Sequence, residues 1–569
     1  MSEQVTAKDL TAKEKTALFW ASFLSLVAAG VGFAFRIAKG GEYGAEFALT
    51  YQQVGQIMGA SFWPIAVTMI LFSLVVDKTG YKRPMYVAFA LQAASGILAF
   101  TASSYAGLYY AAVCAGLGHG IVEAVINPIC AAVYPKDKTK RLTILHAAWP
   151  AGVAGGSLLI MGADAVAEIG WKIHALWIVL PAVAYALMYR SCRFPVDERV
   201  QAGVSYRQML QQVGFLGASL AAVLLVYELG NSLGFASGNW LKTSLITGGV
   251  IGLVFGLAVR SVGKPLFFLL CCLMLPVATA ELATDGWIQE LMRPALGGMG
   301  IHVGFAIVFS ATVMLLLRIF AGSILQFFSP PALLALSGLL SAVGLYWLSG
   351  AAGVAVLIAF LLYAVGQTYY WPCILGFTSE RYPEGGALTL NTVSAMGLLF
   401  FGIIGAPILG VAFDQSIHSS LAEKEAQFSE IATTQGNFLG SSHAAIDKAA
   451  LIPESVKNEK DELVPYDANN NGMPDREEHL ANLDDQGKTA IKNAWAWMDG
   501  LSPEENTRVR NSFGAEAGEA GRDVLKFAAR FPAILVIAFG LIFLYFRSRG
   551  GYKPVELRAE PHDRVEEGG

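Results

Sequence analysis

Apolar runs of about twenty residues, separated by short polar connectors, fill most of the chain. A run of this length forms a helix that can cross the ~30 Å hydrocarbon core of a bilayer. The pattern predicts fourteen spans, at roughly 16–37, 54–76, 84–103, 107–133, 141–162, 171–190, 211–230, 242–260, 265–284, 300–320, 331–349, 353–377, 388–412 and 529–546.

Composition agrees with this pattern and narrows the class of protein. Of 569 residues, 54% are hydrophobic and only 15% are charged, whereas about a quarter of the residues in soluble domains are charged. The sequence contains no P-loop, catalytic triad or zinc-ligand spacing, so it predicts neither an enzyme nor an ATP-driven pump. We therefore expect an all-α polytopic protein in a lipid bilayer. We expect it to be a monomer, with no organic cofactor and no nucleic-acid partner.

The distribution of lysine and arginine predicts the orientation of the spans. Cytoplasmic loops of membrane proteins are enriched in these residues. Basic residues gather in alternate connectors and in the tail, at 77–83, 136–141, 190–207, 260–264 and 547–549. This distribution places both termini in the cytoplasm and the chain in the inner (plasma) membrane. The polar segment 414–528 then lies on the extracytoplasmic face.

The spans group into two halves with additional segments. Two of them end in Tyr-Pro at the same distance from a glycine, from Gly118 to Pro135 and from Gly366 to Pro383, which supports an internal repeat. The predicted parts are an N-terminal six-helix half at 1–190, a linker with an extra helix pair at 191–263, five helices of the C-terminal half at 264–413, a polar insertion at 414–528, and the last helix with its tail at 529–569.

Polar side chains interrupt the fourth span. Glu123 and Asn127 are one helical turn apart and therefore share a face. A carboxyl group within hydrocarbon is costly, so it is by default part of a pathway or binding site. A proton-coupled carrier needs such a carboxyl group. The group is neutral while the carrier changes between its two orientations, and it is ionised when the site is open to water. The alternative is a structural carboxyl that is bonded to Asn127 or to a neighbouring backbone group.

Other polar and aromatic residues are candidates for the same site. His119 and His146 could relay protons or bind hydroxyl groups, or they could serve packing alone. Gln367 and Asn391 could bind the hydroxyl groups of a substrate. Aromatic rings suit the apolar C–H face of a sugar, although they also form packing contacts and interfacial belts; the candidates are Trp149, Tyr369, Tyr370 and Trp371.

Charged residues near the ends of other spans leave two interpretations open. Arg36 is either a snorkelling anchor or an anion site in the cavity. Glu281 and Asp285, one turn apart at the outer end of the ninth span, are either a cation or sugar contact or a solvated helix end. Arg318 is expected at the inner end of the tenth span.

The connector Asp77-Lys-Thr-Gly80-Tyr-Lys82-Arg83 resembles the signature loop of the major facilitator superfamily. Gly80 permits a tight turn, and Asp77 at a helix end can pair with the basic cluster or with a neighbouring helix terminus. Ser73 stands where the family usually has its first glycine. The resemblance implies a major facilitator fold with two six-helix halves, here with an extra helix pair, and a gating loop formed by Asp77, Gly80, Lys82 and Arg83.

The stretch Glu123-x-x-x-Asn127-Pro128 is similar to the fucose and glucose–galactose permease branch of that superfamily. In this branch the glutamate of the motif is a proton and sugar residue, and Glu123 occupies its place. The resemblance implies a secondary transporter, a symporter that takes up a sugar or similar small solute with protons or another coupling ion. Together with the candidates named above, the predicted substrate and proton residues are Arg36, Glu123, Asn127, His146, Trp149, Gln367, Tyr370, Trp371 and Asn391.

Two alternatives to a symporter remain at this point. One is an exporter of amphipathic compounds with the same fold, since Gly152-Val-Ala-Gly-Gly156 faintly resembles an antiporter motif. The other is a membrane receptor that transports nothing and uses the insertion as its sensing domain.

The insertion contains a sequence typical of an EF-hand calcium loop. It places oxygen ligands at alternate residues and Gly472 at the sharp turn. The alternative is a chance acidic turn. We expect a structural Ca²⁺ ion that orders the insertion, with the ligands Asp467, Asn469, Asn471, the Met473 carbonyl, Asp475 and Glu478.

Calcium binding by this loop should be weak. Two of the three early ligands are asparagines, and extracellular sites of this kind have a Kd of about 10⁻⁴–10⁻³ M. Titration calorimetry of the isolated segment 415–527 should detect this binding. Glu478→Gln removes the bidentate ligand and should weaken it. A segment that takes up no Ca²⁺ would contradict the prediction.

Overall fold

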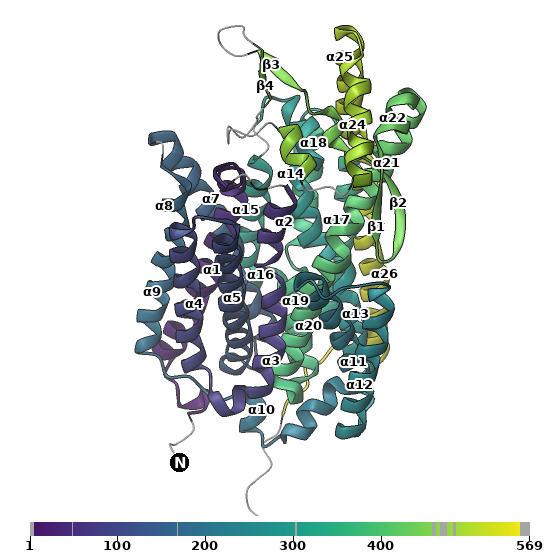
Figure 1. The fold of residues 1–569 in the computed structure, drawn as a ribbon. Coiled ribbons are helices and arrows are strands. Elements are labelled where there is room, and N and C mark those ends of the chain that lie inside the picture. The colour runs from purple at the N-terminus through teal and green to yellow at the C-terminus, as the bar shows by residue number, and fades with distance from the viewer. Residues whose placement is uncertain are drawn as a thin grey trace, which may run out of the picture.

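The computed structural model describes residues 5–47, 49, 51–167, 169–301, 304–457, 463–466, 475–481 and 485–557. It is a bundle of long helices with a smaller part at one end (Figure 1). Among the described residues, 13 helices are long and apolar enough to cross a membrane, and α15 (Phe305–Ile319) is a shorter apolar helix. Each predicted span coincides with one of these helices, which confirms the all-α polytopic class.

The first six spans form the N-terminal half. Three of them are divided into shorter helices, between α2 and α3, between α6 and α7, and between α8 and α9, where the turn η2 intervenes. The elements are η1 (Ala7–Asp9), α1 (Ala12–Glu46), α2 (Tyr51–Gly59), α3 (Trp63–Thr79), α4 (Lys82–Thr101), α5 (Tyr105–Val133), α6 (Lys138–Leu145), α7 (Ala148–Val166), α8 (Trp171–Ala175), η2 (Leu176–Ile178) and α9 (Val179–Arg190).

The extra pair and the C-terminal half follow. The pair, α11 and α12, packs along its length, and α11 also contacts α20 of the C-terminal half. The elements are α10 (Glu198–Gln201), α11 (Tyr206–Ser232), α12 (Trp240–Val259), α13 (Pro265–Ala278), η3 (Thr279–Ala283), α14 (Thr284–Gly297), α15, α16 (Ala321–Leu325), α17 (Pro330–Gly350), α18 (Val354–Gln367), α19 (Tyr370–Arg381), η4 (Pro383–Gly385), α20 (Gly386–Phe400), η5 (Phe401–Gly405), α21 (Ala406–Lys424) and α26 (Arg530–Ser548).

The insertion mixes helices with two short antiparallel hairpins, which the sequence did not predict. The hairpins pair β1 with β2, Thr433 opposite Ile446, and β3 with β4. The predicted amphipathic pattern of Ile491, Ala494, Trp495 and Met498 is confirmed, because all four are buried on α24. The elements are α22 (Ala426–Ala432), β1 (Thr433–Phe438), β2 (Ser441–Ile446), η6 (Lys448–Leu451), β3 (Ser455–Lys457), β4 (Leu463–Pro465), α23 (Asp475–Ala481), α24 (Asp485–Asp499) and α25 (Pro503–Ala528).

Most of the predicted calcium loop lies outside the described residues. Asp475 is the first residue of α23. The ligands outside the described part are Asp467, Asn469, Asn471 and Met473, together with the side chain of Glu478.

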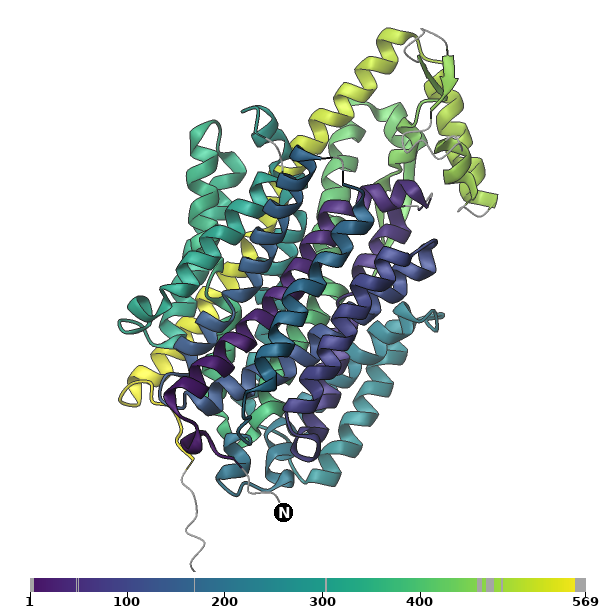
Figure 2. The same ribbon diagram turned by 90° about the vertical axis from the view of Figure 1, so that its left-hand side faces the viewer.

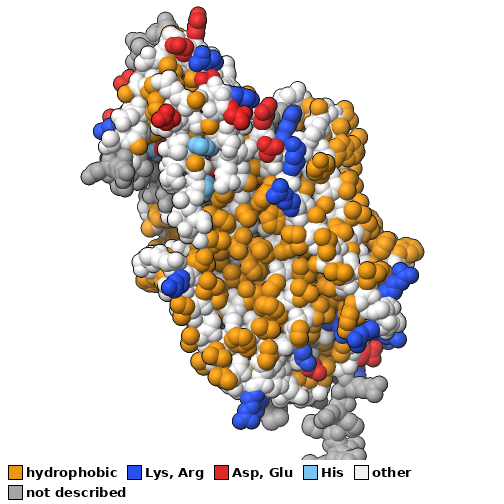
Figure 3. Space-filling view, turned by 90° about the vertical axis from the view of Figure 1, so that its right-hand side faces the viewer, with side chains coloured by type: hydrophobic (Ala, Val, Ile, Leu, Met, Phe, Trp, Pro, Cys, Tyr) orange, Lys and Arg blue, Asp and Glu red, His pale blue; other side chains and the backbone are white. Residues whose placement is uncertain are grey.

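The insertion packs on the C-terminal half and shares a core with it. Its long helix α25 contacts α14 and α17, and Leu291 of α14 belongs to the same apolar cluster as Trp495 and Val524. Figure 2 shows α25 running into α26 as one long helix. We call the end of the bundle with the insertion the distal face and the end with η1 and residues 549–557 the terminal face. A band of hydrophobic side chains lies between these ends (Figure 3).

Close backbone contact joins α1 and α7. A Cβ atom added to Gly30 would lie 2.6 Å from the Trp149 carbonyl oxygen and 2.9 Å from Gly152 Cα, and one added to Gly152 would overlap the Val27 carbonyl. The small residues therefore let the two helices approach each other closely.

A methyl group at this contact should destabilise the protein. Gly152→Ala forces α1 and α7 apart and should cost about 1–3 kcal/mol, measured by unfolding in detergent. Gly155→Ala is the matched control, because a Cβ there meets nothing within 4 Å. This control should be neutral or slightly stabilising. Equal losses in the two variants would contradict the close contact.

Candidate functional site

Prolines free three backbone carbonyl groups near the centre of the molecule. Proline has no N–H, so the carbonyl four residues earlier loses its partner in the helix. A buried carbonyl without a donor is costly. The three pairs of carbonyl and proline are Ala124 with Pro128, His146 with Pro150, and Thr368 with Pro372.

Side chains of the C-terminal half bind all three carbonyls. Arg318 of α15 donates from Nη1 to the His146 carbonyl (3.0 Å) and from Nε to the Thr368 carbonyl (2.7 Å). Asn391 of α20 donates from Nδ2 to the Ala124 carbonyl (3.1 Å) and to Ser73 Oγ (2.7 Å). Arg318 and Asn391 therefore each join the two halves through a carbonyl that proline has freed.

The first polar cluster lies in the N-terminal half. Asn127 Nδ2 donates to Glu123 Oε2 (2.8 Å), and Asn127 Oδ1 lies 3.0 Å from His146 Nε2. His119 Nε2 lies 3.6 Å from Glu123 Oε1, and its ring stacks on Trp149 at 5.1 Å. Glu123 is only 8% exposed. The structure thus brings together four predicted site residues, Glu123, Asn127, His146 and Trp149, around one carboxyl group.

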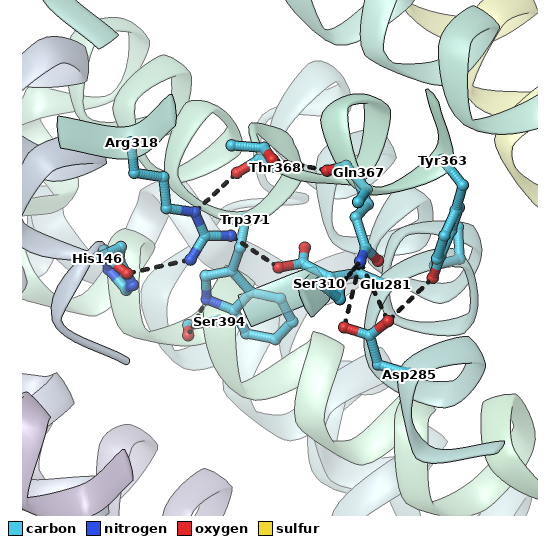
Figure 4. Close-up of polar contacts among 12 residues, drawn as sticks. His146, Glu281, Asp285, Ser310, Arg318, Tyr363, Gln367, Thr368, Trp371 and Ser394 are labelled. Atoms are coloured by element: carbon cyan, nitrogen blue, oxygen red, sulfur yellow. Dashed lines mark hydrogen bonds and ion pairs between the residues drawn. The ribbon is translucent and has the colours of Figure 1, made fainter. Parts of the chain in front are cut away.

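The second polar cluster lies in the C-terminal half (Figure 4). Arg318 Nη2 donates to Glu281 Oε1 at 2.8 Å, and both side chains are buried. Gln367 Nε2 donates to Asp285 Oδ1 (3.1 Å) and to Ser310 Oγ (2.8 Å). Tyr363 donates to the Ala280 carbonyl (3.0 Å) and to Asp285 Oδ1 (3.3 Å).

This arrangement corrects one expectation from the sequence and qualifies another. Glu281 is 4% exposed, so it is not part of a solvated helix end. Arg318 lies in the last turn of α15, as expected, but it is only 2% exposed and is therefore not a solvated helix end. Its helix is followed by α16, and its guanidinium faces the carbonyls of both halves.

A π-helical turn positions the Glu281 carboxyl. Residues Thr279–Ala283 form η3, a wide turn between α13 and α14. Thr284 Oγ1 donates to the Thr279 carbonyl (2.9 Å), and η3 packs against a second π turn, η5. Single π turns within α-helices are frequent at functional sites.

The two clusters are closed off on both sides. Toward the distal face, Phe62 and Phe401 lie 5.1 Å apart between ring centres, and Ala154 packs with Ala311. Toward the terminal face, Thr139 Oγ1 donates to Glu380 Oε1 (2.5 Å). The contacts on either side join the two halves, so the described arrangement is an occluded one.

The tail after α26 reinforces the closure at the terminal face. Tyr552 donates to Glu380 Oε2 (2.7 Å), and the Val555 N–H donates to the Glu380 carbonyl (2.8 Å). Lys138 Nζ binds Glu198 Oε2 (2.6 Å) and the Ser379 carbonyl (3.3 Å).

The predicted gating loop lies at this same face. Gly80 has a φ of 65°, the left-handed conformation that its turn was predicted to need. Lys82 Nζ donates to the carbonyls of Arg190 (3.1 Å) and Cys192 (3.0 Å), which ties the loop to the end of α9. Arg83 is exposed, and the side chain of Asp77 lies outside the described part of the chain.

Other predicted site residues lie in different places. Trp371 is beside Glu281 and Arg318 (Figure 4) and donates to Ser394 Oγ (3.2 Å). Tyr370 donates to the Ser337 carbonyl (3.3 Å) of α17, within the C-terminal half. Arg36 lines a separate cavity inside the N-terminal half.

Sequence reasoning underestimated the second cluster. The signals were present, since Arg318 and Glu281 interrupt apolar runs and Pro150 and Pro372 each follow a helix break. It was not evident that one arginine would serve both breaks, because that depends on which helices are neighbours in space.

Removing the Arg318 guanidinium should destabilise the protein strongly. Arg318→Met leaves Glu281 buried without its partner, which costs about 3–5 kcal/mol in comparable buried pairs. The double variant Arg318→Met/Glu281→Met leaves no buried charge of this pair and should be more stable than Arg318→Met alone, measured by unfolding in detergent. A double variant less stable than Arg318→Met would contradict this pairing.

Three solved structures with a similar fold are distant from this chain in sequence. The proton:xylose symporter XylE, bound to 6-bromo-6-deoxy-D-glucose, is 13% identical with a TM-score of 0.52, over 73% of this chain and 91% of that one. A variant of the E. coli fucose:proton symporter FucP is 14% identical with a TM-score of 0.51, over 73% and 93%. The human organic anion transporter MFSD10 is 13% identical with a TM-score of 0.51, over 69% and 93%.

At these identities the likeness to solved structures shows the fold alone. No curated protein matches the sequence. A family model described as Major Facilitator Superfamily matches residues 18–407, which is more than half of the chain. With its polytopic helices and this match, the chain belongs to the major facilitator superfamily.

Proposed function

We propose that the protein is a proton-coupled symporter that takes up a sugar or similar small polar solute by alternating access. The observation that carries the proposal is that polar contacts from both halves meet at His146. Asn127 joins Glu123 to the His146 ring, and Arg318 joins Glu281 to the His146 backbone carbonyl. Glu123 belongs to the N-terminal half and Glu281 to the C-terminal half. A proton gained by either carboxyl group can therefore alter the contacts between the halves.

The balance of charge in the closed core supports proton binding. The two clusters contain three carboxyl groups, Glu123, Glu281 and Asp285, and among the described contacts only Glu281 pairs with the Arg318 guanidinium. With neutral histidines and three ionised carboxyls, the core would hold uncompensated negative charge in a membrane interior, which is costly. Bound protons remove this charge without the space that a metal ion would require.

Unused acceptor atoms support a solute rich in hydroxyl groups. Gln367 Oε1 and Asn391 Oδ1 are buried and have no hydrogen-bond partner among the described residues. Both are carbonyl-type oxygens, which accept hydrogen bonds from hydroxyl donors. Trp149 and Trp371 supply aromatic rings near the same core, as sugar binding would use. XylE and FucP, which share the fold, are described as xylose and fucose symporters.

Opening of either face requires contacts between the halves to break. The bonds from Arg318 to the His146 carbonyl and from Asn391 to the Ala124 carbonyl lie at the interface itself. In the proposed cycle, solute hydroxyl groups and water take over these carbonyls when the halves separate. Protonation of Glu123 then sets which arrangement is stable.

The remaining parts of the proposal concern orientation and calcium. The terminal face, with the basic connectors, is proposed to be cytoplasmic in an inner (plasma) membrane, and the insertion extracytoplasmic. The EF-hand-like loop is proposed to hold a structural Ca²⁺ ion within the insertion.

Glu123→Gln should separate proton coupling from solute binding. The amide resembles the protonated carboxyl, so the variant should still exchange solute across proteoliposomes but no longer accumulate it on a proton gradient. Measurements are solute uptake and solute-driven proton influx, using a sugar that raises the thermal stability of the purified protein. Glu228→Gln, at a carboxyl of α11 outside both clusters, is the matched control and should retain accumulation.

Other outcomes would redirect the proposal. Unchanged accumulation in Glu123→Gln would remove this carboxyl from the coupling. Solute binding without any flux in the unmodified protein would favour a receptor. Proton-driven efflux of amphipathic compounds would favour an exporter.

A further inference from the structure

Arg36 lies inside the N-terminal half, away from the interface between the halves. It lines a cavity bounded by α1, α2, α4, α5 and η2, together with Gly32, Tyr43, Ile57, Ser95 and Leu108. Measured as the space open to the centre of a water-sized sphere, the cavity is ≈ 20 Å³. One such sphere needs ~10–15 Å³. The cavity therefore has room for one or two particles of that size and not for a sugar.

The positive charge of Arg36 has no acidic partner among the described residues. None of the described residues that line the cavity is acidic. The carboxylates nearest in sequence are engaged elsewhere, because Glu42 pairs with Lys39 and Glu46 pairs with Lys172. The Nε atom of Arg36 is buried, and no described group hydrogen-bonds to it. The residue as a whole is half-buried. A charge that is partly removed from water and faces mostly apolar walls is costly unless an opposite charge joins it.

We propose that this cavity binds a small monovalent anion of the size of chloride, with the Arg36 guanidinium as its main ligand. A guanidinium cannot lose its proton to become neutral, so an anion is the remaining way to balance it. The walls are mostly apolar, and they would not replace the hydration of a multiply charged anion. This site is independent of the proposed transport function.

Tyr43 supplies the second ligand of the proposed site. Its side chain is buried, and its hydroxyl group makes only a long contact, 3.5 Å, with the Arg36 carbonyl. The proton of this hydroxyl can turn toward an anion in the cavity. Ser95 is a poorer donor, because its hydroxyl already donates to the Gln92 carbonyl at 2.8 Å.

The backbone at Gly32 leaves room for the Ile178 side chain beside the guanidinium. A Cβ atom there would lie 2.8 Å from Ile178 Cδ1 and 3.6 Å from Arg36 Nη1. The adjacent residue, Phe33, points to the other side of α1, where its ring contacts Trp149 (5.2 Å) and Phe62 (5.6 Å). An anion beside Arg36 would therefore hold α1 against α4, α5 and η2 and leave the Trp149 side of α1 unobstructed.

The test is the anion dependence of thermal unfolding of the full-length protein in detergent. Chloride replaces gluconate at constant ionic strength. The unfolding midpoint should rise with chloride and saturate, as binding to the folded state alone requires. Bromide should act similarly, and sulfate and gluconate should not. Arg36→Met should abolish the rise, and Tyr43→Phe should raise the apparent Kd roughly tenfold. Arg190→Gln, at an exposed arginine, is the control and should respond like the unmodified protein.

Several results would overturn the site. One is the absence of any rise in the unfolding midpoint of the unmodified protein with chloride. Another is an equal rise in Arg36→Met, because the effect would then come from another site or from a general effect of salt. If Arg36→Met does not fold, Tyr43→Phe decides, since an unchanged apparent Kd in that variant removes the proposed ligand set.

Discussion

The closed structure depends on one guanidinium that serves two broken helices and one carboxylate. Arg318 binds the carbonyls of His146 and Thr368 and pairs with Glu281. Each carbonyl is free to accept a hydrogen bond because the residue four positions later is a proline, which has no N–H. The donor is the Arg318 side chain of α15. Without Arg318, two spans would leave these carbonyls unsatisfied whenever the core is closed and water cannot reach them. The same atoms therefore satisfy the backbone and join the two halves.

An interaction of this kind suits a protein that must exchange one arrangement for another. Hydrogen bonds between a side chain and a freed carbonyl can be replaced by water or solute without unfolding any helix, whereas regular helical bonds cannot. Asn391 and the Ala124 carbonyl repeat the device at a second helix. The π turn at Glu281 and the one packed against it add wide turns to the same region. The centre is thus formed from irregular backbone that neighbouring protein covers, the condition under which membranes tolerate it.

Much of the fold could be predicted from the apolar runs in the sequence. A helix that crosses the hydrocarbon core is built from about twenty mostly apolar residues, and this length is visible in the sequence. The grouping of Glu123, Asn127 and His146 was also predictable, the first two from helical spacing and the third from the short connector that follows. The positions of Glu281 and Arg318 were not. Their depth depends on a π turn and on contacts between helices distant in sequence, and neither leaves a periodic pattern. The hairpins β1–β2 and β3–β4 were missed for a related reason, since short polar strands resemble loops.

The continuity of α25 with α26 has a mechanical consequence. At 1.5 Å per residue, the 26 residues of α25 reach about 39 Å beyond the last membrane helix. Because α25 is also fastened to α14 and α17, the whole insertion must tilt with the C-terminal half as one lever. A small change in the angle of the C-terminal half therefore becomes a large displacement at the far end of the insertion.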